Sequence, residues 1–354
     1  MHSNTSLCPN SSCPSHTRPR LAGQAPHGSF STRRGRLGRT RCTICGRTRS
    51  GRAGTPYHRM RRPASDLDRA VKMSTEGMSI AGIARVLGVH PTTVRRWLEK
   101  AGAHVERFSE EYLVVDEPEE VQLDELRVGG IQEAEGTWAW SAIEVMSRAW
   151  LAVKVSRRTL RATRQFLADV RESCGKMVFP TMFSTDEFKY YAPVIHKLFG
   201  PLAAHVEVKN RYANGGIVRT TFRLRNTPEY RYDFARERLE DSKRPNTAYV
   251  ERLNLFERTC CCYLRRRTPA RARKPQFVEC LLELLRGYYN FIKPHLSLRF
   301  GREYRTPAMV AGCAKRRLTW REILSWVPPV ERRRRWGTVL DLTQPRRVLL
   351  GGGA

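Results

Sequence analysis

The segment from Pro245 to Leu264 places Glu251, Asn254 and Arg258 three and then four residues apart. In a helix this spacing brings a carboxylate, an amide and a guanidinium to one face. The opposite face would carry an apolar stripe made of Tyr249, Leu253, Phe256, Cys260 and Tyr263. The ordinary interpretation is a solvated helix face with a weak Glu–Arg pair. The alternative is one part of an active site, and the rest of the chain must decide between the two.

Two aspartates upstream are able to complete such a site. Asp124 lies in the strand-like run VQLDELRV, and Asp186 follows the buried run MVFPTMFST. Glu125 and Glu187 adjoin them, so each position has an acidic neighbour. From residue 120 onward the pattern reads as three strands, a helix, a strand, a helix and a strand, which predicts an α/β fold with a mixed sheet. In this order the first and fourth strands can lie side by side, and the later helix can lay Glu251 beside both aspartates.

Three carboxylates in one place repel each other, and their ionised forms need a cation. A ligand set made only of oxygen atoms favours a hard ion, Mg²⁺ or Mn²⁺. Two such ions can flank a phosphodiester and stabilise both the attacking and the leaving oxygen of an in-line displacement. We therefore predict that Asp124, Asp186 and Glu251 hold two divalent ions, with Asn254 and Arg258 flanking them on the same helix face.

The charge balance indicates the kind of partner. The chain has 354 residues, with 64 Lys and Arg against 34 Asp and Glu, which gives a net charge of +30. Such an excess favours a polyanion, most simply nucleic acid, because each neutralised phosphate releases counterions. The sequence has neither a long apolar run that would span a membrane nor an apolar signal-peptide core near its start. We expect a cytoplasmic protein that acts at the nucleoid.

Residues 1–60 are rich in Gly, Pro, Ser, Arg and Cys and cannot build an apolar core alone. They contain the pairs CPNSSC and CTIC, and such spacing suits a tetrahedral zinc site closed by two loops. The ligands of one structural Zn²⁺ would be Cys8, Cys13, Cys42 and Cys45. His16 or His27 is an alternative ligand, and a disordered basic arm is the alternative to a zinc site.

Residues 61–101 predict a helix-turn-helix domain. A first helix includes Leu67 and Val71, a second ends at Gly88, and a third restarts with Pro91 in its first turn. The third helix would enter a DNA major groove. Its outward side chains, our candidates for contact with double-stranded DNA, are Thr92, Thr93, Arg95, Arg96 and Lys100. The alternative is a small helical bundle with a solvated basic face.

The remaining segments complete the predicted domain organisation. Residues 102–119 read as an acidic linker, 120–310 as the catalytic domain with an irregular basic insertion at 210–245, and 311–354 as a basic tail with a frayed end. The three consecutive thiols Cys260–Cys262 are expected to pack rather than to bind metal. His295, which follows Pro294, is expected to fill a turn or cap a helix, and a role at the metal site is the alternative.

With these motifs the chain resembles the transposases of the insertion-sequence-one class, in the form where the InsA-like and InsB-like parts are one protein. The resemblance rests on CPNSSC, CTICGRT, GMSIAGIARVLGVHPTTVRRWLEKAG, VQLDEL, FSTDEFKYY, NTAYVERLNL and YYNFIKPHLSLR, and it covers most of the chain. It implies a ribonuclease-H-like catalytic core whose DDE triad falls on Asp124, Asp186 and Glu251. Asn254 and Arg258 match polar positions that follow the glutamate in that family.

The chain departs from this family at a few positions. Arg127 stands where the family has an aromatic residue, Glu187 replaces a glycine after the second aspartate, and Cys260 and Tyr263 replace a histidine and an arginine. The resemblance implies an enzyme that binds terminal inverted repeats as a homo-oligomer, hydrolyses a phosphodiester and joins the freed 3′-hydroxyl to target DNA. One alternative is a non-catalytic DNA-binding regulator derived from a transposase, and another is a structure-specific nuclease on the same fold.

Overall fold

The structure is a computed structural model of the chain. It describes residues 8, 10, 12–14, 24–32, 35–129, 136–213, 216–240, 244–268 and 270–328. The chain divides into two compact units, residues 1–69 with 321–344 and residues 70–320 with 345–354. The predicted frayed end and His16 lie outside the described residues.

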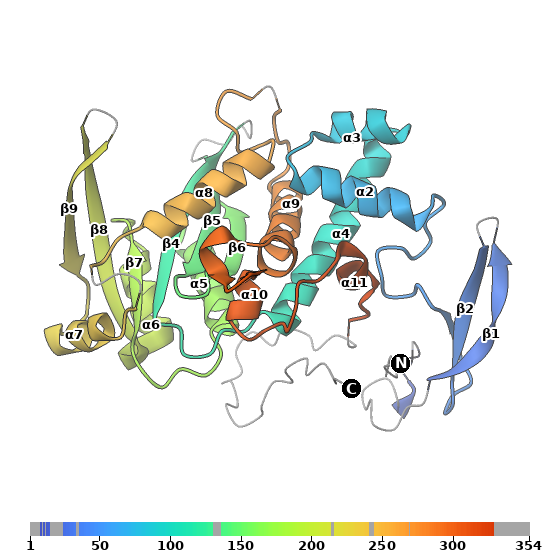
Figure 1. Ribbon diagram of the computed structural model, residues 1–354, viewed down its shortest axis with the longest axis horizontal. Helices are drawn as coiled ribbons and strands as arrows, with labels where there is room; N and C mark the ends of the chain where they lie inside the picture. The colour runs from blue at the N-terminus through green and yellow to red at the C-terminus, as the bar shows by residue number, and fades with distance from the viewer. Residues whose placement is uncertain are drawn as a thin grey trace. The chain divides into compact units, whose positions relative to one another are not determined.

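The larger unit is built on a six-stranded mixed sheet with the order β6-β5-β4-β7-β8-β9 (Figure 1). Strands β4, β5 and β6 pair antiparallel, β7 and β8 join parallel to β4, and β9 returns antiparallel. This confirms the predicted α/β class with a mixed sheet, and the order is that expected of a ribonuclease-H-like core. The strands are β4 (Glu120–Val128), β5 (Thr137–Glu144), β6 (Trp150–Ser156), β7 (Thr181–Thr185), β8 (Ala203–Ala213) and β9 (Gly216–Leu224).

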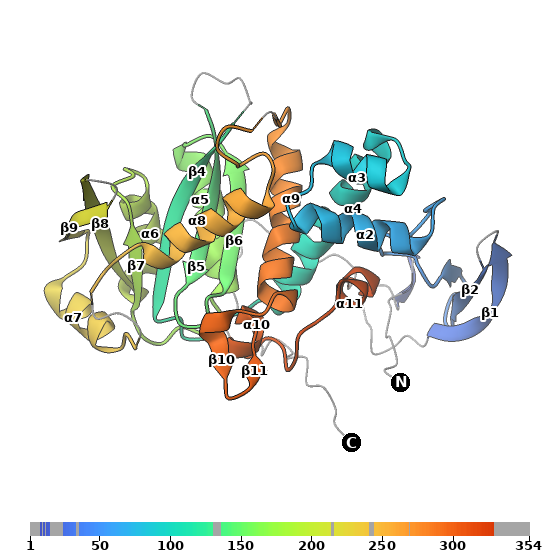
Figure 2. The ribbon, with the colours of Figure 1, turned by 45° about the horizontal axis from the view of Figure 1, so that its top comes forward.

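Helices cover both faces of this sheet. Helices α5 (Leu160–Ser173) and α6 (Tyr191–Phe199) pack on one face, where Trp140 of β5 meets Phe166 at a ring distance of 5.7 Å. Helix α8 (Ala248–Cys260) crosses β4 and β5 on the other face, as Figure 2 shows, with α9 (Pro275–Gly287) against β6. Helix α7 (Glu229–Glu237) packs on β7 and β8.

The first and fourth strands of the sheet are neighbours, as the sequence predicts. Val121 of β4 lies opposite Phe183 of β7, and Gln122 lies opposite Ser184. Continuing this parallel register by two residues brings Asp124 level with Asp186, which follows the last residue of β7. Because the pleat alternates, Asp124 shares the face of Gln122 and points toward helix α8.

Three helices precede the sheet. They are α2 (Ala64–Thr75), α3 (Ile80–Leu87) and α4 (Pro91–Tyr112). The Ser79 side chain caps α3 by accepting from the N–H of Gly82, and Gly88 ends it with φ of 60°. Helix α4 continues through more than half of the predicted linker, because Val105 and Phe108 extend its apolar stripe and are buried there.

After α9 the chain forms a π-helical turn at Tyr288–Ile292, a 3-10 turn at Leu296–Leu298 and a two-stranded hairpin, β10 (Arg299–Phe300) and β11 (Glu303–Tyr304). Two short helices follow, α10 (Pro307–Val310) and α11 (Trp320–Ser325). No helix among the described residues is long and apolar enough to cross a membrane.

The prediction for residues 210–245 was wrong. The basic stretch expected to be irregular instead forms the end of β8, strand β9 and helix α7. The smaller unit holds a small antiparallel sheet of β1 (Gln24–Thr32), β2 (Gly35–Cys42) and β3 (Thr48–Ser50). Polar side chains dominate these strands, and backbone pairing supplies the order that apolar patterning does not predict.

Candidate metal and DNA-binding sites

A pocket of about 680 Å³ opens where β4, β7, β8 and the first turns of α8 meet. Asp124, Asp186 and Glu251 all line it, together with Arg158, Lys209 and Asn210. The structure thus brings the three predicted acids, which are far apart in sequence, to one cavity. Neither Asn254 nor Arg258 is among the described residues that line it, although Asn254 contacts Asp124.

Asp124 is fixed from two sides. The Nδ2 group of Asn254 donates to its Oδ2 at 2.6 Å, and the backbone N–H of Glu125 donates to its Oδ1 at 2.8 Å. Burial raises the pKa of Asp124 to about 6, the two hydrogen bonds oppose this shift, and the charges of Asp186 and Glu251 add to it. A carboxyl group in this setting gains much from a bound cation, which would favour its ionised form.

The closest acidic group differs from the predicted triad in one member. Carboxylate oxygens of Asp124, Glu125 and Asp186 lie within 4.8 Å of one another, and this set can hold a metal ion. Glu251 faces the same pocket from α8 but is not part of that group. Side-chain alternation sends Glu125 to the opposite face from Asp124. Both can approach Asp186, because Asp186 lies beyond the last residue of its own strand.

Arg158 lies against this acidic group. Its Nη2 is 3.1 Å from Oε2 of Glu125 and 3.5 Å from Oδ2 of Asp186. The guanidinium lies over the rings of Trp138 and Phe188, at 4.4 and 4.5 Å from their centroids. Burial and the charge of Asp186 raise the pKa of Glu125 to about 8, and Arg158 opposes that shift. No pattern in the sequence points to this arginine, because its partners come from other strands and loops.

Glu251 is oriented by the residues around the start of α8. Thr247, the N-cap residue of α8, donates its hydroxyl to Oε1 of Glu251 at 2.9 Å. Asn210 of β8 donates its side-chain Nδ2 to the same oxygen at 3.3 Å, and the hydroxyl of Thr220 on β9 donates to the side-chain Oδ1 of Asn210 at 2.8 Å. The two outer strands therefore help to place the third predicted acid.

The sheet-facing side of α8 differs from the predicted stripe. Its buried residues are Val250, Leu253, Asn254 and Glu257, whereas Tyr249, Phe256 and Cys260 are only half-buried. The Gln122 side chain on β4 accepts from the backbone N–H groups of Tyr249 and Val250, at 2.9 and 3.1 Å. With this contact, the polar side chains of Asn254 and Glu257 face the sheet. The sequence pattern did not predict this orientation, because it assigns polar residues to the outward face of a helix.

Glu257 is a buried acid behind the pocket. It accepts from the hydroxyl of Ser141 at 2.5 Å, and Ser141 lies opposite Asp124 in the β4–β5 pairing. Its side chain is fully buried, and burial raises its pKa to about 8. The neighbouring Arg258 is half-buried, and its charge opposes this rise.

The donor set at the pocket fits a hard divalent cation. All the donors in the acidic group are carboxylate oxygens. Behind them the Oδ1 atom of Asn254 is buried and has no hydrogen-bond partner among the described residues. Mg²⁺ and Mn²⁺ prefer such oxygen ligands and keep several waters, which an open pocket can accommodate.

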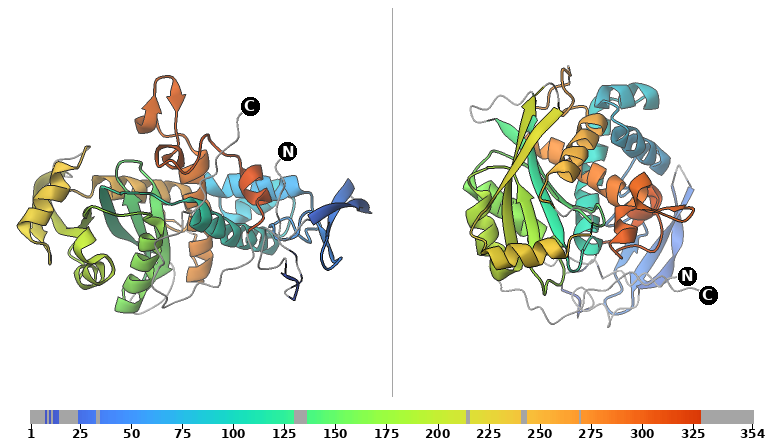
Figure 3. Two further views of the ribbon diagram at one scale, coloured as in Figure 1. Left: turned by 90° about the horizontal axis from the view of Figure 1, so that it is seen from below. Right: turned by 60° about the vertical axis from the view of Figure 1, so that its left-hand side comes forward.

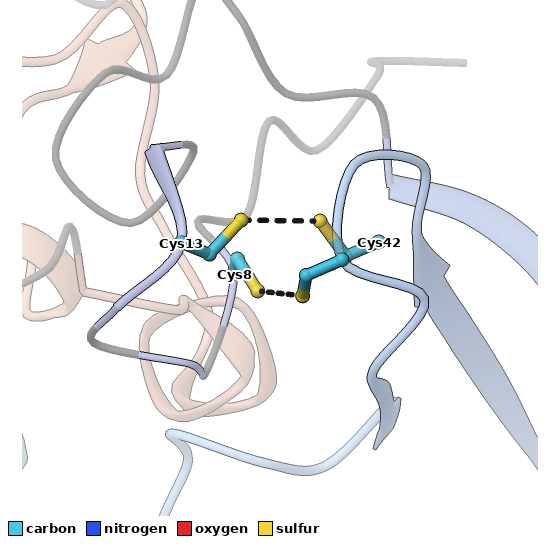
Figure 4. A group of neighbouring side chains, drawn as sticks. Cys8, Cys13 and Cys42 are labelled. Atoms are coloured by element: carbon cyan, nitrogen blue, oxygen red, sulfur yellow. Dashed lines mark hydrogen bonds between the residues drawn. The ribbon is translucent and has the colours of Figure 1, made fainter.

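The smaller unit gathers the four predicted cysteines. Figure 4 shows the thiols of Cys8 and Cys13 facing the loop that follows β2. The sulfur atoms of Cys8 and Cys45 are 3.3 Å apart, and those of Cys13 and Cys42 are 3.9 Å apart. Sulfurs at tetrahedral zinc, with Zn–S near 2.3 Å, are about 3.8 Å apart. All four sulfurs lie within 4.8 Å of one another, so the cluster can hold a metal ion.

The loop geometry supports the same cluster. Gly46 follows Cys45 with φ of 71° and donates its N–H to the carbonyl of Cys42 at 2.9 Å, which closes a tight turn. The backbone N–H of Arg47 donates toward Cys45 and lowers the pKa of that thiol. A thiolate is the form that ligates metal.

Helix α4 exposes part of the predicted DNA-binding set. Thr92, Arg96 and Lys100 are exposed, four residues apart along one face. Thr93 is half-buried, and Arg95 pairs with Glu99 at 3.2 Å while its guanidinium lies 5.6 Å from the ring centroid of Phe277. The ring nitrogen of His90 accepts from the N–H of Thr92 and caps the helix start.

Comparison with known families and proteins agrees with this geometry. Residues 69–102 match a family model described as a homeodomain-like domain. No curated protein matches the chain. The chain therefore contains a helix-turn-helix DNA-binding domain, followed by a mixed sheet with helices and preceded by a four-cysteine cluster.

Proposed function

We propose that this protein is a DNA transposase of an insertion sequence, acting on the ends of its own element. The observation that carries the proposal is the combination in one chain of a helix-turn-helix DNA-binding domain and an acid-lined pocket on a ribonuclease-H-like sheet. The excess of positive charge supports a nucleic-acid substrate.

In this proposal Asp124, Asp186 and Glu251 would hold two Mg²⁺ or Mn²⁺ ions, and such ions would supply activation of a water and stabilisation of the leaving oxygen. Asn254 holds Asp124 in place, and Thr247 and Asn210 hold Glu251. Arg258, at the same helix, would contribute positive charge near the substrate. The freed 3′-hydroxyl then attacks target DNA, so no covalent protein–DNA intermediate is needed.

The helix-turn-helix domain would bind the terminal inverted repeats of double-stranded DNA. Thr92, Arg96 and Lys100 form its exposed contact face, and Thr93 and Arg95 lie beside them. One structural Zn²⁺, held by the four-cysteine cluster, would order the segment before this domain. Because two element ends must be held together, we propose that the active form is at least a dimer.

The test is cleavage and joining of a duplex that carries the element end, in the presence of Mg²⁺. We expect the wild-type chain to cut the duplex, and Asp124→Asn, Asp186→Asn and Glu251→Gln each to cut at least about 1000-fold more slowly, because each removes a metal ligand. Arg164→Ala, an exposed residue of α5 on the other face of the sheet, is the matched control and should cut normally.

One observation favours a second function. Glu251 lies outside the closest acidic group, and Arg158 already lies beside Asp186. This arrangement also fits a transposase-derived regulator that binds DNA without cutting it. If the wild-type chain binds end DNA but cuts no faster than Asp124→Asn, the regulator is the correct function. Cleavage without joining of supplied 3′-hydroxyl ends would instead identify a nuclease.

A further inference from the structure

The hairpin β10–β11 is separate from the large sheet. Within the part of the chain that the structure describes, its two strands pair only with each other, with Arg299 opposite Tyr304 and Phe300 opposite Glu303. Gly301 makes the tip with φ of 58°, where a side chain would be strained. In Figure 3 the hairpin projects beyond the neighbouring elements α9 and α10.

Large apolar side chains are exposed on and beside this hairpin. The exposed fraction is 72% for Phe300, 41% for Tyr304 and 81% for Leu296, which precedes the first strand. A short isolated ribbon gains little stability from side chains that stay in water. Such exposure over a contiguous stretch indicates a binding surface.

Two arginines lie over these rings, and each arginine comes from the opposite side of the hairpin from its ring. The guanidinium of Arg305 lies 5.1 Å from the ring centroid of Phe300, and that of Arg299 lies 5.3 Å from the ring of Tyr304. Arg302 is exposed at the tip. The single acid on the ribbon is Glu303, so the surface has an excess of positive charge beside its aromatic rings.

The base of the hairpin is firmly anchored. The N–H of His295 donates to the carbonyl of Arg305 at 3.0 Å, and Nε of Arg305 donates to the carbonyl of Leu298 at 3.1 Å. His295 packs against Tyr289 at 4.3 Å, and Tyr289 packs against Phe256 of helix α8 at 5.2 Å. Contacts through His295 and Tyr289 thus connect the base of the hairpin to α8, the helix that carries Glu251.

We propose that the hairpin β10–β11 is a second DNA-binding element, a ribbon that enters the major groove of a DNA duplex. A two-stranded ribbon has the width of that groove. Arg299 and Arg302 would contact phosphates, and Phe300 would contact apolar base edges such as thymine methyl groups. The positive charge of the ribbon favours DNA over an apolar protein partner. This inference rests on the DNA-binding part of the proposed function but not on catalysis.

The test measures binding of the full-length chain to a fluorescent duplex by anisotropy over a range of salt concentrations. We expect Phe300→Ala to weaken binding about tenfold, because it removes the apolar contact in the groove. The double variant Arg299→Ala/Arg302→Ala should lower the slope of log affinity against log salt by about two, one for each lost phosphate contact. Tyr230→Ala on α7, where the side chain is 71% exposed, and Arg164→Ala are matched controls.

A photocrosslinking phenylalanine analogue at Phe300 tests contact directly and should attach to the duplex. Normal binding by the hairpin variants and no crosslink, while Arg96→Ala weakens binding, would overturn the inference and leave the proposed function standing. The inference is also overturned if the hairpin variants lose only RNA binding or self-association. If the wild-type chain binds no duplex, the inference and the proposed function both fall. If the wild-type chain does not cut DNA but the hairpin variants still weaken duplex binding, the inference is supported and only the proposed catalysis is contradicted.

Discussion

Acidic side chains in and behind the pocket outnumber the cationic side chains that line it. Burial raises the pKa values of Asp124 to about 6 and of Glu125 and Glu257 to about 8, and it also raises that of Asp186. Hydrogen bonds from Asn254 and Ser141 oppose these shifts only in part. Burying ionisable acids costs free energy, so a cluster of acids with raised pKa values is typical of a functional site such as a cation-binding site.

Glu257 offers a test of this cost that is separate from the pocket itself. Its pKa is about 8 in the folded chain against 4.5 as a free side chain, so the folded chain holds a proton that the unfolded chain releases. The contribution of this group to the free energy of unfolding is fully present below pH 4.5 and is lost as the pH rises through 8. Glu257→Gln keeps the acceptor for Ser141 and removes the titration. We expect it to raise the free energy of unfolding at pH 8 by about 1–3 kcal/mol.

Urea unfolding at pH 5.5 and pH 8 measures this effect. The difference in stability between the two pH values should be smaller in Glu257→Gln than in the wild-type chain. Glu303→Gln, an exposed residue of β11, is the control and should leave the difference unchanged. Equal pH dependence in the wild type and Glu257→Gln would show that Glu257 is ionised in the folded chain.

Residue type and order along the chain predicted that Asp124, Asp186 and Glu251 lie near one another, and all three line the pocket. The sequence did not predict that Glu125 belongs to the closest acidic group or that Glu257 is buried behind the pocket. Glu125 sits on the other face of its strand, and only the position of Asp186 past the end of β7 brings it into the group. Such details depend on where a strand ends, which a pattern of residues does not fix.

At the scale of elements, the loop after β2 and the neighbouring strands are ordered although they have almost no apolar core to stabilise them. The strands β1 to β3 have few apolar residues, and the four-cysteine cluster is the buried centre of their unit's first segment. A metal ion would supply the free energy that a small apolar core does not. The expected ion is Zn²⁺, because the ligand set is four thiols.

We predict about one zinc ion per chain, measured by elemental analysis of the purified protein. Cys42→Ser should lose the ion, because it removes a buried ligand, and a strong chelator should release it from the wild type. Cys260→Ser, a half-buried thiol at the end of α8, is the matched control and should keep the ion. A wild-type chain that holds no zinc would show that the thiols form an ordinary buried cluster.

The elements also show where sequence patterns reach their limit. Helices α2 and α3 and the strands of the sheet follow their apolar periods, and Ser79 and Gly88 mark the ends of α3 where capping rules place them. Strand β8 was predicted but strand β9 was not, because β9 is polar and, among the described residues, pairs only with β8. A strand with little buried surface has a weak apolar alternation to detect.

At the scale of the whole larger unit, the turn between the first two helices of the DNA-binding domain touches helix α8, which carries Glu251. Gly77, between α2 and α3, has φ of 82°, and a Cβ atom there would lie 2.8 Å from the carbonyl oxygen of Thr259 near the end of α8. The hydroxyl of Tyr288 donates to Glu76 in the same turn at 2.8 Å. The helix-turn-helix domain and the acid-lined pocket are thus packed together through α8 rather than joined by a free linker.

This packing and the net charge of +30 lead to the last prediction. DNA binding should be dominated by phosphate contacts, so affinity should fall by about 10³–10⁵ between 50 and 200 mM salt. Binding should persist without Mg²⁺ and in Asp124→Asn, because the proposed DNA contacts of α4 do not involve the acids of the pocket. Cleavage should need both Mg²⁺ and the Asp124 carboxylate. Anisotropy titrations of the same duplex, with and without a chelator, measure binding. A flat salt response, or binding that disappears with Mg²⁺, would mean that the pocket and not the basic surface holds the DNA.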